Sequence, residues 1–216
     1  MQTVTLAEAK SKAMLASHGL VIADERVVGD SAAAVAAAEA MGMPVVVKLN
    51  GDRIAHKTER GLVRLNLRTL DAVREAADAL LGAATPDDGD VNLLVAQQVR
   101  GNRELIAGLV RDPQLGLAVM LGIGGIFAEA IADVAFRLVP VSRLDAYELI
   151  EDLATQKVLG EFRGEPPVDR EKLADVLLAL SACGEQHPDV VSIDVNPLII
   201  CDGAPIAVDA LIEVER

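Results

Sequence analysis

The sequence contains few aromatic residues, with three Phe, one Tyr and no Trp among 216 residues. Because 51% of the residues are apolar, a sizeable hydrophobic core must be built from aliphatic side chains. Cations are also in the minority, since 20 Lys and Arg stand against 33 Asp and Glu and give a net charge of −13. Binding to nucleic acid needs a basic face and usually aromatic stacking partners, and an anionic membrane repels an acidic surface. The composition therefore argues against nucleic acid and membranes as partners.

Cysteine is rare as well. Cys183 and Cys201 have no metal-ligand spacing, and two cysteines in a chain of this length indicate a reduced, cytosolic protein. Residues 1–10 are polar rather than signal-like, and no apolar run reaches the roughly 18 residues that a membrane span needs. We therefore expect a cytoplasmic protein that forms one large domain or two small lobes.

The rest of the chain is organised around residues 45–63. A continuous apolar run that ends at Lys48 predicts a buried strand, which places the lysine on a stiff element. A polar loop with two glycines follows and carries His56 and Lys57, and residues 63–67 then alternate as a half-buried strand does. The P-loop pattern is absent. A cationic loop between two strands suits the binding of phosphates, because backbone N–H groups and lysines both face the anion.

Helices and strands elsewhere follow from periodicity, caps and glycines. The predicted helices are a helix that begins at the capping box Thr5–Glu8 and ends near Gly19, residues 32–41 with Ser31 as cap, 71–81, 143–154, and 170–183 between the cap Asp169 and a stop at Gly184. The predicted strands are residues 91–99, 104–110, 117–121, 127–131 and 134–139, the last four forming an antiparallel sheet. Residues 85–90 read as a linker. We expect two lobes, residues 1–98 and 99–216.

A hairpin at the C-terminal end brings oxygen ligands together. In residues 191–196, Ser192, Asp194 and Asn196 share one face of a strand. If Asp202-Gly203 is a two-residue hairpin loop, Asn196 lies directly opposite Asp209, with Cβ atoms about 4.5–5.5 Å apart. Such a pair is able to share one Mg²⁺, which takes few protein ligands. The alternative is a solvated hairpin with polar residues on its outer face.

Three further patterns have ordinary explanations beside functional ones. Residues 121–129, which include Gly124, Gly125 and Glu129, are glycine-rich but do not match a dinucleotide fingerprint, and a tight turn between strands explains them. Glu129 and Arg137 flank a turn at Asp133, and a surface ion pair between them is the simpler interpretation. Taken alone, His56 resembles an ordinary exposed loop histidine.

Taken in order, the motifs of this chain resemble a known family, the ATP-grasp β subunits of ADP-forming acyl-CoA synthetases, also called acetate–CoA ligases (ADP-forming). The matching motifs are Gly42–Lys48, His56–Val63, Gly101–Gly108, Arg111–Pro113, Gly122–Gly125, Asp133–Pro140, Glu161–Gly164, Asp194–Leu198 and Val208–Ala210. Two positions depart from the family pattern. Leu62 stands in place of a second glycine, which predicts a stiffer loop, and Leu115 stands in place of a phenylalanine.

The resemblance implies an α/β ATP-grasp fold in which two lobes hold Mg-ATP or Mg-ADP in a cleft. Lys48 would bind phosphates, Gln98 and Val99 would lie at the adenine side, and Asn196 and Asp209 would bind Mg²⁺. The full cofactor-binding set that it implies is Lys48, Lys57, Gln98, Val99, Glu104, Gly124, Gly125, Glu129 and Arg137. Without nucleotide, the loop of residues 52–61 is expected to be open and partly disordered.

The resemblance also implies a reaction: acyl-CoA, ADP and phosphate give a carboxylate, CoA and ATP, reversibly. A histidine of a separate α subunit exchanges phosphate with the acyl phosphate in this family, and His56 would carry the phosphoryl group on to ADP. Asp194 would orient a histidine or balance its charge at that point. The CoA-binding and CoA-ligase domains are absent from these 216 residues, so the resemblance implies an α partner that carries them.

Two other classes remain open on the sequence. One is a non-catalytic nucleotide-sensing subunit of the same fold, and retention of Lys48, Asn196 and Asp209 speaks against it, since a sensor is free to lose them. The other is a carboxylate–amine ligase module that uses an acyl phosphate directly. Retention of His56 speaks against that class, because its chemistry needs no phosphohistidine.

Overall fold

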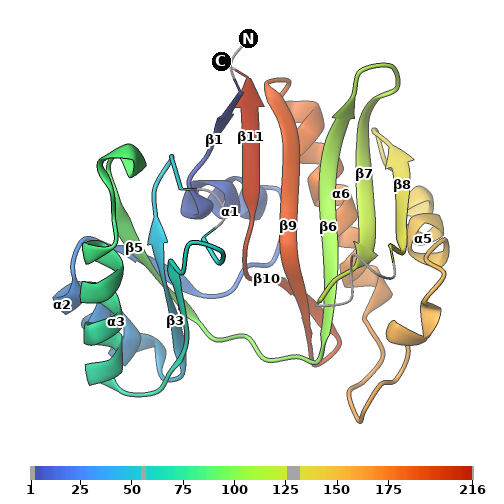
Figure 1. The fold of residues 1–216 in the computed structure, drawn as a ribbon. Coiled ribbons are helices and arrows are strands. Elements are labelled where there is room, and N and C mark those ends of the chain that lie inside the picture. Colours follow the sequence, from blue (N-terminus) through green and yellow to red (C-terminus); the bar gives the residue numbers. More distant parts are fainter. Residues whose placement is uncertain (1–2, 55–56, 126–131, 216) are drawn as a thin grey trace. The chain divides into compact units, whose positions relative to one another are not determined.

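The structure of the protein, a computed structural model, describes residues 3–54, 57–125 and 132–215 (Figure 1). The chain forms two compact units. Unit 1 comprises Met1–Val4, Ser11–Ile22 and Val99–Arg216, and unit 2 comprises Thr5–Lys10 and Ala23–Gln98. The chain thus passes from unit 2 to unit 1 after Gln98, at the predicted lobe boundary, but the first 22 residues are divided between the units.

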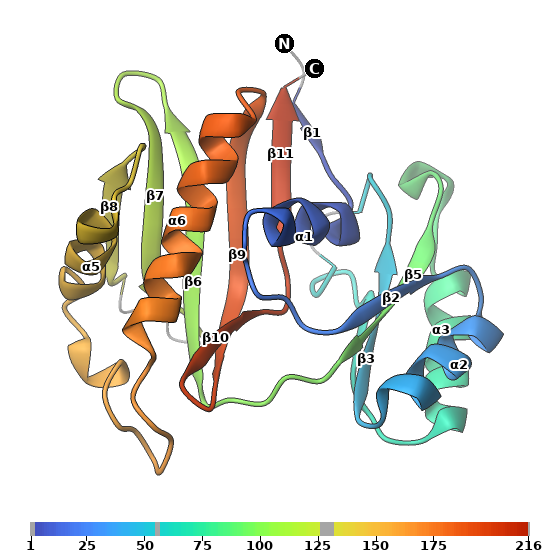
Figure 2. The same ribbon diagram turned by 180° about the vertical axis from the view of Figure 1, so that it is seen from behind.

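Unit 2 is a four-stranded antiparallel sheet with two helices on one face (Figures 1 and 2). The strand order is β2-β5-β3-β4. The bounds of its elements are β2 Glu25–Val28, α2 Ser31–Met41, β3 Val45–Asn50, β4 Val63–Leu67, α3 Leu70–Gly82, the 3₁₀ turn η1 Pro86–Asp88 and β5 Asn92–Gln97. All the predicted elements of this region therefore form.

The central strand β3 decides which way Lys48 points. Val45, Val47 and Leu49 belong to the buried core beneath α2 and α3. Because side chains alternate along a strand, Val46, Lys48 and Asn50 lie on the opposite face of the sheet. Lys48 is buried there, with a side chain only 8% exposed.

Unit 1 is a seven-stranded sheet in the order β1-β11-β9-β6-β7-β8, and β10 also pairs with β9. The bounds of its elements are β1 Thr3–Thr5, α1 Glu8–Ser17, β6 Arg103–Asp112, β7 Gly116–Ile123, β8 Val134–Leu138, α5 Arg143–Glu151, the 3₁₀ turn η2 Gln156–Val158, α6 Arg170–Gln186, β9 Val190–Cys201, β10 Ala204–Ala207 and β11 Leu211–Glu215. Helices α5 and α6 cover one face of this sheet, the face turned toward the viewer in Figure 2.

Four helix ends differ from the sequence expectations. Helix α5 ends at Glu151 rather than at residue 154. Asp30 rather than Ser31 caps α2, and its carboxylate accepts the N–H of Ala33 at 2.8 Å. Helix α1 begins at Glu8, beyond the expected cap at Thr5, which ends strand β1. Helix α6 starts after Asp169 as expected but continues past Gly184 to Gln186. Gly184 is a site of close packing instead of a stop, because a Cβ there would approach Leu109 Cδ1 to 2.7 Å.

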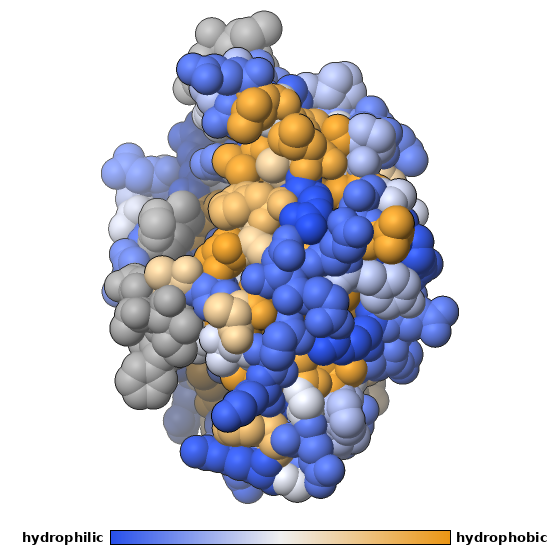
Figure 3. All heavy atoms as spheres, turned by 90° about the vertical axis from the view of Figure 1, so that its right-hand side faces the viewer, coloured by the Kyte–Doolittle hydropathy of each residue, from blue (hydrophilic) through white to orange (hydrophobic). Residues whose placement is uncertain are grey.

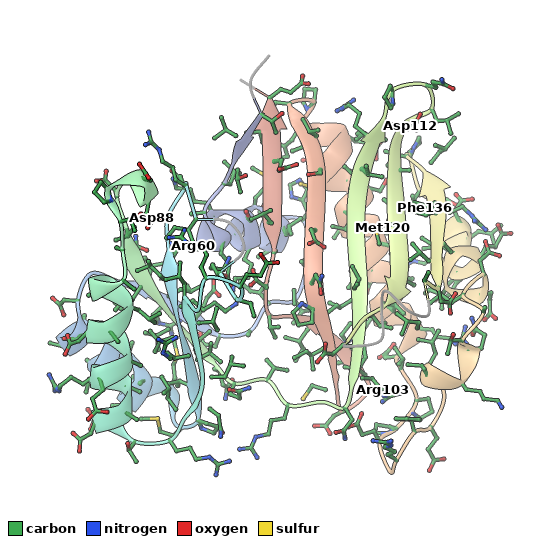
Figure 4. All side chains as sticks on the ribbon, in the orientation of Figure 1. Arg60, Asp88, Arg103, Asp112, Met120 and Phe136 are labelled. Carbon is green, nitrogen blue, oxygen red and sulfur yellow. The ribbon has the colours of Figure 1, made fainter. Side chains whose placement is uncertain are left out.

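The stretch expected to be a linker, residues 85–90, is a packed turn. Asp88 is buried and accepts two hydrogen bonds from the guanidinium of Arg60, at 2.7 and 2.9 Å (Figure 4). The N–H and hydroxyl of Thr85 donate to the same carboxylate. These hydrogen bonds, of which those from Arg60 have the larger effect and those from Thr85 the smaller, hold the pKa of Asp88 well below its usual range. Local sequence pattern does not reveal this pairing, because Arg60 lies 28 residues earlier.

Replacing Asp88 with Asn should lower the melting temperature of the protein by a few degrees at pH 7. A carboxyl whose pKa is lower in the folded than in the unfolded protein stabilises the fold above its unfolded pKa of about 4, and this contribution fades as the pH falls toward the folded value. The difference between wild type and Asp88→Asn is therefore expected to shrink below about pH 4. Thermal melts from pH 7 to pH 3 check this, with exposed Asp87→Asn as the matched control. A pH-independent difference contradicts it.

A buried arginine fixes the loop after η2. Arg103 is 2% exposed and donates to the carbonyls of Val158, Gly160 and Pro166, the last at 2.6 Å (Figure 4). It also pairs with Glu165 at 3.2 Å. These carbonyls belong to the last residue of η2 and to the irregular backbone that follows it, so the guanidinium satisfies acceptors that no helix or strand would satisfy.

The edge strand of unit 1 exposes apolar side chains. Val134, Phe136 and Leu138 of β8 are 41 to 51% exposed, and Leu144 of α5 is 67% exposed. Figure 3 shows apolar surface on the side of the molecule that carries β8 and α5. Separately, no helix in the described part of the chain is long and apolar enough to cross a membrane.

Candidate functional site: a lysine pair and a row of oxygen ligands

In unit 2, Lys48 and Lys57 share one carboxylate. Lys48 Nζ lies 2.6 Å from Glu8 Oε1, and Lys57 Nζ lies 3.0 Å from Glu8 Oε2. The side chains of Lys48, Lys57 and Glu8 are 8%, 7% and 1% exposed, respectively. Two ammonium groups therefore meet at one carboxylate at a site with little water, an arrangement that suits contact with an anion such as a phosphate.

The structure thus adds Glu8 to the candidate residues, although the sequence alone indicated only a capping role for it. The first turn of α1 lies against the end of β3, because Asn50 Oδ1 accepts the N–H of Ala9 and Asp52 Oδ1 accepts that of Ala7. These two side chains satisfy donors that a helix start leaves unpaired. The signal in the sequence that could have indicated this contact is the pair of polar residues at the end of the expected phosphate-binding strand, Asn50 and Asp52.

The loop between β3 and β4 is partly packed. Ile54 and Leu62 are 3% and 2% exposed and belong to the core of unit 2. Arg60 is held by Asp88. Within the stretch expected to be open, residues 52–61, Ile54 and Lys57 are buried, whereas Asp52, Arg53 and residues 58–61 are exposed. An open loop in the absence of nucleotide stays a prediction, and Leu62, a leucine in place of glycine, adds a buried side chain directly after it. His56 lies outside the described residues.

In unit 1, the hairpin has the expected register. Cys201 pairs with Ala204 across the turn and Leu198 with Ala207, as predicted. Strand β11 continues with Asp194 opposite Leu211. The pairings of β10 and of β11 with β9 have the same register. Asp209 lies between β10 and β11, so the same register places it opposite Asn196. Asp194 and Asn196 are exposed on one face of β9, while Val195 is buried on the other.

The negative charge of Asp209 acts on the carboxyl of Asp194. The protein around Asp194 removes part of the water from its carboxylate, and this desolvation and then the negative charge of Asp209 raise the pKa of Asp194. The carboxylate of Asp194 and the amide oxygen of Asn196 on β9, with the carboxylate of Asp209 between β10 and β11, match the ligands that Mg²⁺ prefers. The residues present therefore fit a divalent cation, which would relieve the repulsion between the two carboxylates.

Glu104 of β6 lies on the face of the sheet that carries Asp194, and Gly124 and Gly125 lie beside it. The N–H of Gly124 donates to the Glu104 carbonyl at 2.8 Å, and a Cβ on Gly124 would come within 3.0 Å of the backbone of Glu104. Gly125 has a φ of +83°, and the nearest atom to a Cβ there is Glu104 Oε2. Glycine is thus required at Gly124 by close approach and at Gly125 by conformation.

Arg137 does not join this group. It pairs with Asp152 of the α5 end at 2.7 Å and with Glu148 at 3.7 Å. Its strand neighbour Phe136 pairs with Met120, on the face that carries Asp194, so Arg137 points toward the helices (Figure 4). We therefore leave Arg137 out of the proposed site. Glu129, its expected partner, lies outside the described residues.

Gln98 is the last residue of unit 2, and Val99 is the first residue of the segment that follows in unit 1. The Gln98 N–H donates to the Pro44 carbonyl at 3.2 Å, and its side-chain oxygen accepts the N–H of Asn66 at 2.9 Å. Gln98 is thereby held against β3 and β4. Val99 is half-buried. Their role beside an adenine ring stays a prediction.

Two motifs that carry the family resemblance have structural roles. Asp112 accepts the N–H groups of Gln114 and Leu115, which shapes the tight turn between β6 and β7 and lowers the pKa of its carboxyl (Figure 4). Asp133 accepts those of Ala154 and Thr155 after α5. Leu115, the second departure from the family pattern, is 69% exposed at that turn.

Comparisons with known proteins agree with this picture. A family model described as an ATP-grasp domain matches residues 2–214. The chain is 35% identical to the β subunit of acetate–CoA ligase [ADP-forming] I of Pyrococcus furiosus, over 95% of this chain and 90% of the relative. It is 33% identical to acetate–CoA ligase [ADP-forming] I of Archaeoglobus fulgidus, of which it covers only 29%.

Solved structures show the same fold. The chain superposes on dinucleotide forming acetyl-coenzyme A synthetase 1 of Ca. Korarchaeum cryptofilum with a TM-score of 0.91 and 33% identity, covering 98% of this chain and 94% of that one. Another structure of that protein, described with Mg-AMPPCP and a phosphohistidine segment pointing towards the nucleotide binding site, matches with a TM-score of 0.83 at 34% identity over 98% and 93% of the two chains. The expected ATP-grasp fold is thus confirmed, and this chain belongs to the ATP-grasp family, in the group formed by the β subunits of ADP-forming acetate–CoA ligases.

Proposed function

We propose that this chain is the nucleotide-binding β subunit of an ADP-forming acyl-CoA synthetase. The reaction converts acyl-CoA, ADP and phosphate into a carboxylate, CoA and ATP, and runs in both directions. The observation that carries the proposal is that a chain of β-subunit length and fold keeps both a buried lysine pair and a row of oxygen ligands. A protein with only a structural role has no reason to keep either set.

Each unit contributes its own group of residues to this function. Lys48 and Lys57 bind phosphate oxygens, and Glu8 holds the two ammonium groups in position. Asn196 and Asp209 hold Mg²⁺, which would offset the charge of the phosphates when bound. Gln98, Val99, Glu104, Gly124, Gly125 and Glu129 complete the nucleotide-binding set.

The phosphoryl group passes through His56. One imidazole nitrogen of His56 takes the phosphoryl group as its bond to the donor breaks, and ADP then attacks the phosphorus to form ATP and free the imidazole. Asp194 orients the imidazole or balances its charge. The phosphohistidine segment described for the Korarchaeum protein supports a relay of this kind.

The chain works with a second subunit. Two of its relatives, of which it covers 90% and 84%, are named β subunits of ADP-forming acetate–CoA ligases of Pyrococcus furiosus. A separate α subunit would then supply CoA binding and CoA ligation. The two cysteines are free thiols, which fits a cytoplasmic location for the assembly.

The test uses the isolated chain and the variant Asp209→Asn. Wild type is expected to bind Mg-ADP and Mg-ATP without turning over acyl-CoA until the α subunit is added. Asp209→Asn should bind the Mg-nucleotide roughly tenfold more weakly or worse while keeping its melting temperature, because an anion facing a metal site is not a core residue. Calorimetric titration measures the affinity.

The matched control is Asp202→Asn in the hairpin turn, where Asn tolerates the observed φ of 48°. Equal binding by wild type and Asp209→Asn overturns the assigned metal role. Nucleotide binding with no turnover even in the presence of the α subunit overturns the enzymatic function and leaves a nucleotide sensor.

A further inference from the structure

Three potential metal ligands meet in unit 1, and none of them belongs to the proposed nucleotide set. His18, Cys183 and His187 each offer a ligand atom, and these atoms all lie within 4.8 Å of one another. The two imidazole rings are in edge-on contact, with centroids 5.4 Å apart. Cys183 is buried, and both histidines are half-buried, so the cluster lies just below the surface.

Two helix ends build the cluster. His18 follows the last residue of α1, Cys183 lies in the last turn of α6, and His187 is the residue that caps α6 (Figure 2). Residues four apart on a helix lie on the same side, and the His187 N–H donates to the Cys183 carbonyl at 3.0 Å. From Ser11 onward α1 is fixed to the sheet, because Ser11 Oγ accepts the N–H of Ile212 and Lys12 donates to Val208. Cys183 thus lies on α6, and His18 and His187 directly follow α1 and α6.

The tautomer of His18 suits a metal ligand. Its Nδ1 lies 2.9 Å from the carbonyl oxygen of Met14, which is able only to accept a hydrogen bond. Nδ1 must therefore carry the proton, and the lone pair is on Nε2. A backbone carbonyl that fixes one ring nitrogen and frees the other is the usual arrangement around metal-binding histidines.

We propose that His18, Cys183 and His187 form a binding site for Zn²⁺. Two imidazoles and a thiolate are ligands that Zn²⁺ accepts in tetrahedral geometry, and a water molecule fills the fourth position. Tetrahedral bonds of the usual lengths place neighbouring ligand atoms about 3.3–3.7 Å apart, so small side-chain rotations close the observed spacing. On binding, the S–H bond of Cys183 gives way to an S–Zn bond, the proton goes to solvent, and no electrons are transferred.

A reactive cysteine is the competing explanation for the cluster, and the environment argues against it. Cys183 is 0% exposed, so its sulfur is not presented to a substrate as that of a reactive cysteine is. The two histidines beside it instead offer a small metal ion two further ligands. Bound Zn²⁺ would link the end of α1 to the end of α6 and stabilise unit 1 through mass action.

The test titrates Zn²⁺ into the full chain after chelator treatment, with excess Mg²⁺ present to occupy oxygen-ligand sites. One equivalent is expected to bind and to raise the melting temperature, and Co²⁺ used as a probe should give a thiolate-to-metal charge-transfer band. Cys183→Ala should weaken Zn²⁺ binding at least about 100-fold and remove that band. The matched control is Cys201→Ser, which should retain both the affinity for Zn²⁺ and the charge-transfer band with Co²⁺.

His187→Asn keeps the test decisive if Cys183→Ala fails to fold, because His187 is half-buried and caps the helix end. It should weaken Zn²⁺ binding about tenfold or more. The site is overturned if wild type fails to bind one equivalent of Zn²⁺. It is also overturned if Cys183→Ala and His187→Asn both bind Zn²⁺ as tightly as wild type, or if Cys201→Ser loses as much affinity for Zn²⁺ as they do. None of these results bears on nucleotide binding, so the proposed function is tested separately.

Discussion

Replacing His56 with Ala is expected to abolish the synthetase reaction of the assembled enzyme. The imidazole forms the covalent bond to the phosphoryl group, and loss of a nucleophile typically lowers turnover by a factor of roughly 10³ or more. Affinity for Mg-ADP should change little, because Lys48, Lys57 and the oxygen ligands remain. Initial rates with the α subunit and calorimetric titration of the isolated chain measure the two quantities.

A labelling experiment separates a phosphoryl carrier from a residue that only binds phosphate. Labelled Mg-ATP, or labelled phosphate with acyl-CoA and the α subunit, should place acid-labile, base-stable label on this chain. The label should map to the peptide that contains His56 and be absent from His56→Ala and His56→Asn. Near-normal turnover by either variant shows that the relay does not pass through His56.

Replacing Glu8 with Gln is expected to destabilise the protein by about 3 kcal/mol, the typical cost of removing one partner from a buried ion pair. The variant leaves the ammonium groups of Lys48 and Lys57 side by side without the carboxylate that both contact. A bound nucleotide would supply the missing negative charge. Mg-ADP should therefore raise the melting temperature of Glu8→Gln by more than that of wild type.

Lys48→Met is the informative counterpart of Glu8→Gln. It keeps the Glu8–Lys57 pair, whose charges balance, so it should lose less stability than Glu8→Gln but bind Mg-nucleotide roughly 100-fold more weakly. Chemical denaturation and calorimetric titration compare the variants, with exposed Glu39→Gln on α2 as the control. If Glu8→Gln is as stable as Glu39→Gln, the carboxylate does not hold the lysine pair.

Local pattern alone determined a large part of this fold. The short continuous apolar run before Lys48 predicted β3 as a strand buried on both faces, and strict alternation predicted β4, because side chains along a strand point to opposite faces. The Asp202-Gly203 turn set the hairpin register, because a two-residue loop permits one pairing of the flanking strands. Counting residues back from that turn was enough to place Asn196 opposite Asp209.

What the sequence could not supply are contacts between residues far apart in the chain. Glu8 meets Lys48 across 40 positions, Arg60 meets Asp88 across 28, and His18 meets the end of α6. Periodicity describes one element at a time, whereas these partners are selected by how whole elements pack. The sequence therefore determined the strands, the hairpin and the family of this protein, and the tertiary structure decided which charges are paired, because packing alone brings distant side chains within bonding distance.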